Sequence, residues 1–119
     1  MKIYIATPVN ARREATLAQK MEMAYLRAEK LKQKLKERYP DAMSYSSFDL
    51  TAFGISDLRN MRESEILGKC VQRVMECDAI FMDWGYEHSK GCTVEHTTAL
   101  TYGKKIIHAY DLSIEPEKF

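Results

Sequence analysis

Short apolar runs alternate with segments of helical periodicity along this chain, and that alternation limits the folds open to it. Lys2 to Ala6 is a β-branched and aromatic run that ends at Thr7 and Pro8, which predicts a buried strand followed by a turn. From Leu17 to Leu35, apolar residues recur at steps of three and four. This spacing predicts an amphipathic helix that ends before Pro40.

The same alternation continues through the rest of the sequence. "AMSYSSF" (42–48) predicts a second strand, and the glycine-containing stretch that follows to residue 60 predicts an irregular loop. Apolar spacing predicts a helix over residues 61–77, followed by a third strand in "DAIFMDW" (78–84). "GCTVEHTTALTYG" predicts a helix closed by Gly103, and "KKIIHAY" predicts a fourth strand.

Strands that alternate with helices are joined by right-handed crossovers, which makes the sheet parallel and covers both of its faces with helices. The 119 residues are enough for one hydrophobic core and too few for two. We therefore expect a single domain over residues 1–119, an α/β fold of the small flavodoxin-like, three-layer kind. Its parallel sheet should have four or five strands in the order 2-1-3-4.

In such sheets, ligands bind beyond the carboxyl ends of the strands, at the point where the strand order reverses. Here this switch point lies between strands one and three. It selects the loop from Thr7 to Arg13, the loop from Asp83 to Gly91, and the stretch after strand two. We expect Thr7, Asn10 and the residues after them to contact a ligand.

Charge and composition exclude several kinds of partner. Lys and Arg number 18 against 17 Asp and Glu, a net charge of +1, so no global field attracts nucleic acid or an anionic membrane. No apolar run approaches the roughly 20 residues that span a bilayer, and the start of the chain lacks signal-peptide features, which indicates a cytoplasmic protein. The three cysteines have no C-x-x-C spacing and are expected to be reduced thiols.

The segment "HSKGCTVEH" falls in the predicted crevice and carries residues suited to chemistry. Gly91 allows the backbone to approach a ligand, and Ser89 with the free N–H groups of the helix start could hold an anion or a sugar hydroxyl. Glu95 would feel the positive end of the helix dipole and stay ionised, which suits a nucleophile. The alternative is that Glu95 is there only because glutamate favours helix starts.

Other residues near the crevice have two interpretations each. Arg12 and Arg13 are expected at the start of the long helix, where the helix dipole disfavours a positive charge. Either a bound 5'-phosphate compensates their charge, or both side chains extend into solvent. Trp84 could stack on a base or cover the core. Cys92 and His96 lie four residues apart, but no full set of ligands has the spacing of a metal site, so we expect neither metal nor cofactor.

Three segments resemble the nucleoside 2-deoxyribosyltransferase superfamily, including its 2'-deoxynucleoside 5'-monophosphate N-glycosidase branch. They are "KIYIATPVN", "CDAIFMDW" and "SKGCTVEHTTALTYGKKI". The most specific feature is S-x-G-x-x-x-E followed by an alanine and a glycine, which is met by Ser89, Gly91, Glu95, Ala99 and Gly103. The resemblance implies that the substrate is a small-molecule nucleoside or nucleotide.

The resemblance also implies a role for particular residues. In that family a glutamate attacks C1' of the sugar, a first-strand tyrosine orients it and the serine contacts the substrate, which points to Glu95, Tyr4 and Ser89. Members that use free nucleosides tend to carry an aspartate at the position of Ser89, so the serine favours the nucleotide-cleaving branch. Members commonly complete the site with a neighbouring subunit. We therefore expect a homodimer or larger oligomer, with "DLSIEPEKF" as a candidate contact.

One departure from the family pattern concerns an acidic residue in the helix before strand three. Lys69 or Cys70 falls near its position here. Asp83 is the candidate to replace it as the group that handles the leaving base, although it could equally cap the following turn. The missing acid keeps open a second hypothesis, a non-catalytic nucleotide-binding or regulatory module. A receiver-like signalling domain is disfavoured because "ATPVN" offers no acidic cluster after strand one.

Overall fold

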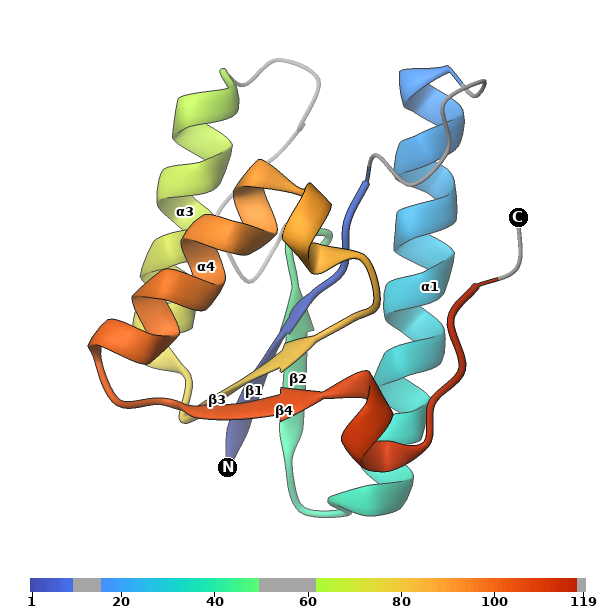
Figure 1. Cartoon of the computed structure of the whole chain (residues 1–119), viewed down its shortest axis with the longest axis vertical. Coiled ribbons are helices and arrows are strands. Elements are labelled where there is room, and N and C mark those ends of the chain that lie inside the picture. The colour runs from blue at the N-terminus through green and yellow to red at the C-terminus, as the bar shows by residue number, and fades with distance from the viewer. Residues whose placement is uncertain (10–15, 50–61, 118–119) are drawn as a thin grey trace.

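A computed structural model describes residues 1–9, 16–49 and 62–117, and its elements follow the predicted order (Figure 1). Most of the predicted loop after the second strand, together with Asn10, Arg12 and Arg13, lies outside the described residues. The elements are β1 (Lys2–Ala6), α1 (Leu17–Arg38), β2 (Met43–Ser46), α3 (Glu63–Glu76), β3 (Ala79–Met82), the short 3-10 helix η2 (Tyr86–His88), α4 (Lys90–Thr101), β4 (Lys105–His108) and the 3-10 helix η3 (Ala109–Leu112).

The strands form one four-stranded parallel sheet in the order β2-β1-β3-β4, which confirms the predicted topology. β1 lies at the centre, with Tyr4 opposite Tyr45 of β2 on one side and Ile80 of β3 on the other. The order reverses between β1 and β3. The carboxyl ends of these two strands therefore frame the crevice that the sequence predicts.

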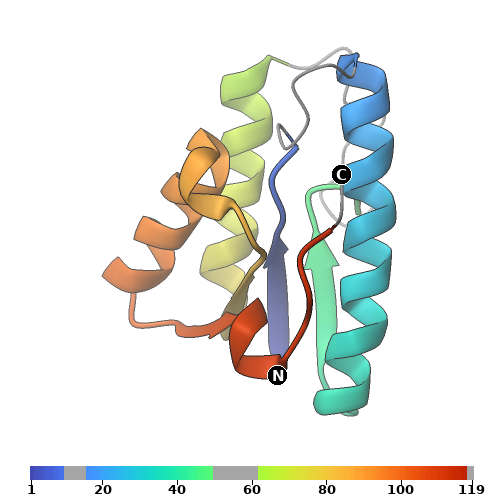
Figure 2. The same cartoon turned by 45° about the vertical axis from the view of Figure 1, so that its right-hand side comes forward.

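Helices cover both faces of the sheet, as Figure 2 shows with α1 on one side and α3 with α4 on the other. Because strand side chains alternate between faces, β1 and β3 contribute to two separate cores. On the α1 side, Ile3, Ile5 and Phe81 pack against Leu31 and Leu35. On the other side the core is built from these residues of β1, α3, β3 and α4: Tyr4, Ala6, Cys70, Val74, Cys77, Ile80, Met82, Cys92 and Ala99.

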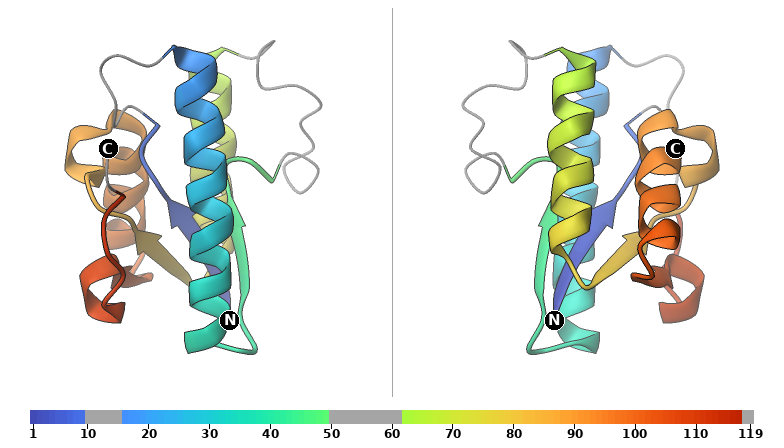
Figure 3. Two further views of the ribbon diagram at one scale, coloured as in Figure 1. Left: turned by 90° about the vertical axis from the view of Figure 1, so that its right-hand side faces the viewer. Right: turned by 90° about the vertical axis from the view of Figure 1, so that its left-hand side faces the viewer.

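The first crossover places α1 antiparallel to the strands. A capping box begins the helix, because Thr16 accepts from the N–H of Gln19 while the Gln19 side chain accepts from the N–H of Thr16. The helix ends two residues before Pro40. Its carboxyl end lies at the same end of the molecule as the amino terminus of the chain (Figure 3). Its amino end therefore returns to the carboxyl edge of the sheet, where the predicted crevice lies.

Helix α4 begins at the crevice and ends away from it. Ser89 is its N-cap, and Gly103, with φ of 66°, provides the left-handed residue that closes it, as predicted. The strands are shorter than the predicted runs, since Asp78 and Asp83 flank β3 instead of belonging to it. The three cysteines are free and buried.

Candidate active site

The centre of the candidate site is a contact between Glu95 of α4 and Tyr4 of β1. The Tyr4 hydroxyl donates a hydrogen bond to Oε2 of Glu95 across 91 positions of sequence. Both side chains are buried, with exposed fractions of 1% for Tyr4 and 5% for Glu95. The structure thus brings together Glu95, which the resemblance implies is the nucleophile, and Tyr4, which it implies orients the nucleophile.

Burial decides the charge state of Glu95. Removal from water raises the pKa of its carboxyl from 4.5 to about 7, and the hydrogen bond from Tyr4 opposes this shift only in part. Burial thus opposes the ionisation of Glu95 that the helix dipole was expected to maintain. Glu95 lies six residues after the N-cap Ser89, beyond the first turn to which the dipole effect is confined.

Tyr4 acts on Glu95 as a neutral donor. Burial, followed by the nearby Glu95 charge, raises the pKa of Tyr4 well above its usual value of 10, so the phenol keeps its proton. Its hydrogen bond favours the ionised form of Glu95 and holds the carboxylate in one orientation. These are the two properties that a positioned carboxylate nucleophile requires.

Two buried thiols complete the surroundings of this pair. Burial, with a smaller contribution from the Glu95 charge, raises the pKa of Cys70 to about 11 and that of Cys92 to about 12. Both thiols are therefore neutral. These two uncharged thiols leave Glu95 in weakly polar surroundings that sustain its raised pKa.

Ser89 and Gly91 lie at the crevice end of the helix that carries Glu95. The Oγ of Ser89 accepts from the N–H of Cys92 at 3.3 Å, so it caps the helix and keeps its own proton available for a ligand. A Cβ added at Gly91 meets no described atom within 4 Å. The fold itself therefore does not demand a glycine here, and the space beside it is open.

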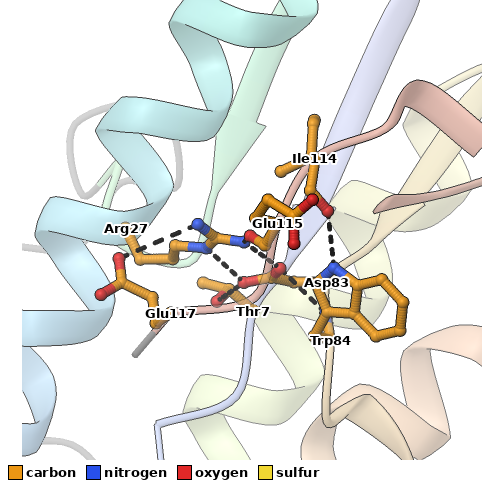
Figure 4. A network of polar contacts seen from close by, with 7 residues as sticks. All are labelled: Thr7, Arg27, Asp83, Trp84, Ile114, Glu115 and Glu117. Carbon is orange, nitrogen blue, oxygen red and sulfur yellow. Dashed lines mark hydrogen bonds and ion pairs between the residues drawn. The ribbon is translucent and has the colours of Figure 1, made fainter. Parts of the chain in front are cut away.

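Asp83 is engaged on the other face of the sheet from Glu95. Its carboxylate, only 4% exposed, accepts from the Thr7 hydroxyl at 2.7 Å and from the backbone N–H of Trp84 at 2.8 Å. It also forms a bidentate ion pair with Arg27 of α1 (Figure 4). The structure brings Asp83 and predicted site residue Thr7 together but does not bring either to Glu95. Because Asp83 accepts from the backbone N–H of Trp84, its position agrees with the alternative that it caps the turn after β3.

Trp84 is 41% exposed at the rim of the crevice, but it is held in place. Its indole Nε1 donates to the carbonyl of Ile114 at 2.7 Å, and its ring lies 6.0 Å from that of Tyr110. The exposed part of the ring is accessible to a ligand. Stacking of Trp84 on a base stays a prediction, as does the contact of Asn10, Arg12 and Arg13 with a ligand.

Neither metal binding nor a membrane span finds support in the described parts of the chain. Within residues 1–9, 16–49 and 62–117, no group of three or more His, Cys, Asp or Glu side chains is arranged to hold a metal ion. The Cys92 side chain of α4 is buried in the core, whereas the ring of His96 packs 5.1 Å from that of Tyr86. None of the described helices is long and apolar enough to cross a bilayer.

Sequence reasoning missed Arg27, which is 4% exposed and links Asp83 to the end of the chain. A signal for it was present. Arg27 lies three residues after Ala24 and four before Leu31, so helical geometry places it on the apolar stripe of α1 beside Ala28. A charged residue at such a position requires a buried partner, because an unpaired charge is costly there.

Comparisons with known proteins agree with this fold. A family model described as a domain of unknown function (DUF4406) matches residues 1–108. A 2-deoxyribosyltransferase from Leishmania mexicana superposes with a TM-score of 0.58 at 19% sequence identity, over 98% of this chain and 74% of its own. Among curated proteins, no sequence matches. At this identity the likeness shows a shared fold, which is the fold that the sequence resemblance implied.

Proposed function

The chain belongs to the DUF4406 family of domains, and we propose that it cleaves the N-glycosidic bond of a 2'-deoxynucleoside or its 5'-monophosphate through Glu95. The observation that carries this proposal is the buried Tyr4–Glu95 hydrogen bond on the α3 and α4 side of the crevice. The fold shared with a 2-deoxyribosyltransferase gives further support. The proposal treats Glu95 as the nucleophile and Tyr4 as its positioning donor.

The reaction would proceed in two steps, as in retaining glycosidases. Oε1 or Oε2 of Glu95 forms a bond to C1' of the sugar while the bond from C1' to the base nitrogen breaks. The transition state resembles an oxocarbenium ion, which a carboxylate beneath the ring stabilises. In the second step water or another base attacks C1' and releases the carboxylate, which makes the enzyme a hydrolase or a transferase.

Release of free base is the direct test. Purified protein is incubated with the four common 2'-deoxynucleosides and their 5'-monophosphates, and the free base is separated and quantified by chromatography. We expect release from at least one of them, with kcat/KM rising with pH through about 7 as Glu95 ionises. An absence of free base from all of these substrates would sink the catalytic proposal.

A non-catalytic nucleotide-binding module is the second candidate. It is favoured by the thiol of Cys70, which stands near the position of the family's acidic residue and keeps its proton, with a pKa of about 11. Calorimetry with the same nucleotides separates the two candidates. Binding without base release supports the module, whereas base release supports the enzyme.

We expect Tyr4→Phe to weaken catalysis without changing the shape of the core. The variant loses the hydrogen bond that favours ionised Glu95, so the pKa of Glu95 rises above about 7. Hydrogen bonds to charged groups contribute about 1.5–3 kcal/mol, which corresponds to a loss in kcat/KM of roughly ten- to hundredfold at neutral pH. The acid limb of the pH profile should move to higher pH in parallel.

Tyr45→Phe is the matched control for this variant. Tyr45 pairs with Tyr4 in register on β2, but among the described residues its hydroxyl hydrogen-bonds to the sulfur of Met43, at 3.8 Å, and not to Glu95. The control should leave the pH profile unchanged. If Tyr4→Phe also leaves the acid limb in place, Tyr4 is a core aromatic residue with no role toward Glu95.

We also infer that the chain forms a homodimer or larger oligomer. Residues 93–102 of α4 and its cap contain one charged side chain, the buried Glu95, and expose Val94, Leu100 and Tyr102 by 40%, 58% and 59%. An uncharged helix face is unusual in a chain with 29% charged residues and suits contact with a second copy. Light scattering at micromolar concentration should give more than the monomer mass, and Leu100→Asp should lower it. A monomeric wild type would contradict this inference.

The "DLSIEPEKF" tail is less suited to that contact than expected. Leu112 packs against the core on the α1 side, and Ile114, with 8% of its surface exposed, belongs to that core. Residues 113–117 then run along α1 of the same chain (Figure 1). A subunit contact through the tail stays a prediction for its outer side chains only.

A further inference from the structure

The polar network around Arg27 joins four parts of the chain at the carboxyl edge of the sheet (Figure 4). Arg27 donates from Nε to Oδ2 of Asp83 at 3.0 Å and from Nη2 to Oδ1 at 2.9 Å. Asp83 in turn accepts from Thr7, directly after β1. One buried guanidinium thus fixes the carboxyl ends of β1 and β3 relative to α1.

The same guanidinium holds the end of the described chain, residues 113–117, which we call the C-terminal strap. Nη2 of Arg27 also donates to the backbone carbonyl of Glu115 at 2.9 Å, and Nη1 lies 3.9 Å from the Glu117 carboxylate. A second tie comes from Trp84, whose indole donates to the carbonyl of Ile114. The strap is therefore attached to the two residues that follow β3. Arg27 bridges it to Asp83, and Trp84 hydrogen-bonds to it.

This network cannot reach the reacting atoms of the proposed reaction. Ala79 and Phe81 face α1, whereas Ile80 and Met82 face α3 and α4, so the alternation of β3 directs Asp83 towards α1. Glu95 binds Tyr4 on the opposite face. The residues that the network does fix are Thr7 and Trp84, which start the two loops that frame the crevice.

We propose that Arg27, Asp83 and the C-terminal strap form a latch that positions Thr7 and Trp84, the described first residues of the segments after β1 and β3, for substrate. This rests on the proposed function. Arg27 and Asp83 are positioning residues, because they hold the loop beginnings and leave Glu95 and Tyr4 to a separate core. Loss of the latch should therefore weaken substrate binding and leave the chemical step intact.

The variant that tests this must keep the domain folded. Removal of one partner leaves an unpaired buried charge, which strongly destabilises a protein, whereas replacement of both partners by apolar residues of similar size is often neutral. We therefore choose the double variant Arg27→Met with Asp83→Leu, assayed below its measured melting temperature. Lys30→Met, one turn further along α1 on an exposed residue, is the matched control.

In the double variant, KM for the substrate found by base release should rise about tenfold, which corresponds to about 1.4 kcal/mol. Its kcat should stay close to that of the wild type, and the Lys30→Met control should change neither value. A merely structural role predicts no change in KM once the variant is folded, and that result would overturn the latch. A fall in kcat at unchanged KM would also overturn it, since it would give Asp83 a part in the chemistry.

The single tryptophan of the chain, Trp84, gives a readout that does not depend on activity. Release of the strap should shift its fluorescence emission to longer wavelength in the double variant but not in Lys30→Met, because the indole loses its partner and gains water. An unshifted emission would overturn the latch whatever the enzyme assay shows. A wild type that releases no base, combined with the expected shift, would count against the proposed function alone.

Discussion

Glu95→Gln is expected to abolish base release and, at the same time, to make the protein more stable above pH 7. The amide keeps the size of the side chain and can still accept the hydrogen bond from Tyr4. It has no charge with which to stabilise the sugar cation and is a poor nucleophile. Turnover should fall on the order of a thousandfold or more, while substrate still binds.

The gain in stability follows from the raised pKa of Glu95. The folded state holds the carboxyl proton up to about pH 7, whereas the unfolded state releases it near 4.5. The resulting stabilisation is fully present below pH 4.5 and is lost as the pH rises through 7, a change of about 3 kcal/mol at most. Gln does not ionise, so it escapes this loss.

Thermal melting against pH measures the effect. Wild type and Glu95→Gln should melt at similar temperatures near pH 4, and the variant should melt roughly 10 °C higher near pH 8. Glu87→Gln, which changes an exposed glutamate in η2, should show no such divergence. If Glu95 were only a helix-start residue, the same change would cost up to about 1 kcal/mol and leave activity unaltered. A variant with undiminished turnover would therefore refute the catalytic assignment.

The order of elements could be predicted because it follows from local patterns. Periodicity located β1, α1 and α4, and the rules for parallel connections then gave the strand order. The meeting of Tyr4 with Glu95 was predicted only through the family resemblance. Nothing in the spacing of two residues 91 positions apart indicates that their side chains touch.

The charge of Glu95 could not be predicted, because it depends on burial by other segments. The sequence shows only that the residue lies early in a helix, whereas its pKa is raised by burial against side chains of β1 and α3. The partner of Arg27 was hidden for the same reason. Its place in an apolar stripe signals that a partner exists, and only the packing of α1 against the end of β3 shows that this partner is Asp83.

The preference for a 5'-phosphate is expected to depend on Ser89, and Ser89→Asp should abolish it. Aspartate is as good an N-cap as serine and is favoured by the helix dipole, so α4 should begin as before and the melting temperature should hold or rise. A phosphate bound at the same helix start would now face a carboxylate. Two unit charges 4 Å apart near a protein surface interact by about 4 kcal/mol, so affinity for the monophosphate should fall about a hundredfold or more.

Calorimetry with a 2'-deoxynucleoside and its monophosphate tests this in wild type and variant side by side. The nucleoside should bind both proteins with similar affinity, because it carries no charge that the new carboxylate could repel. Thr97→Asp is the control, since it adds the same charge about two turns along α4 on an exposed residue, away from the cap. Only Ser89→Asp should remove the preference, which would place the phosphate at the start of the helix that carries Glu95. Equal binding of both ligands by the wild type would exclude phosphate recognition at this site, and a preference that survives in Ser89→Asp would reduce Ser89 to a helix cap.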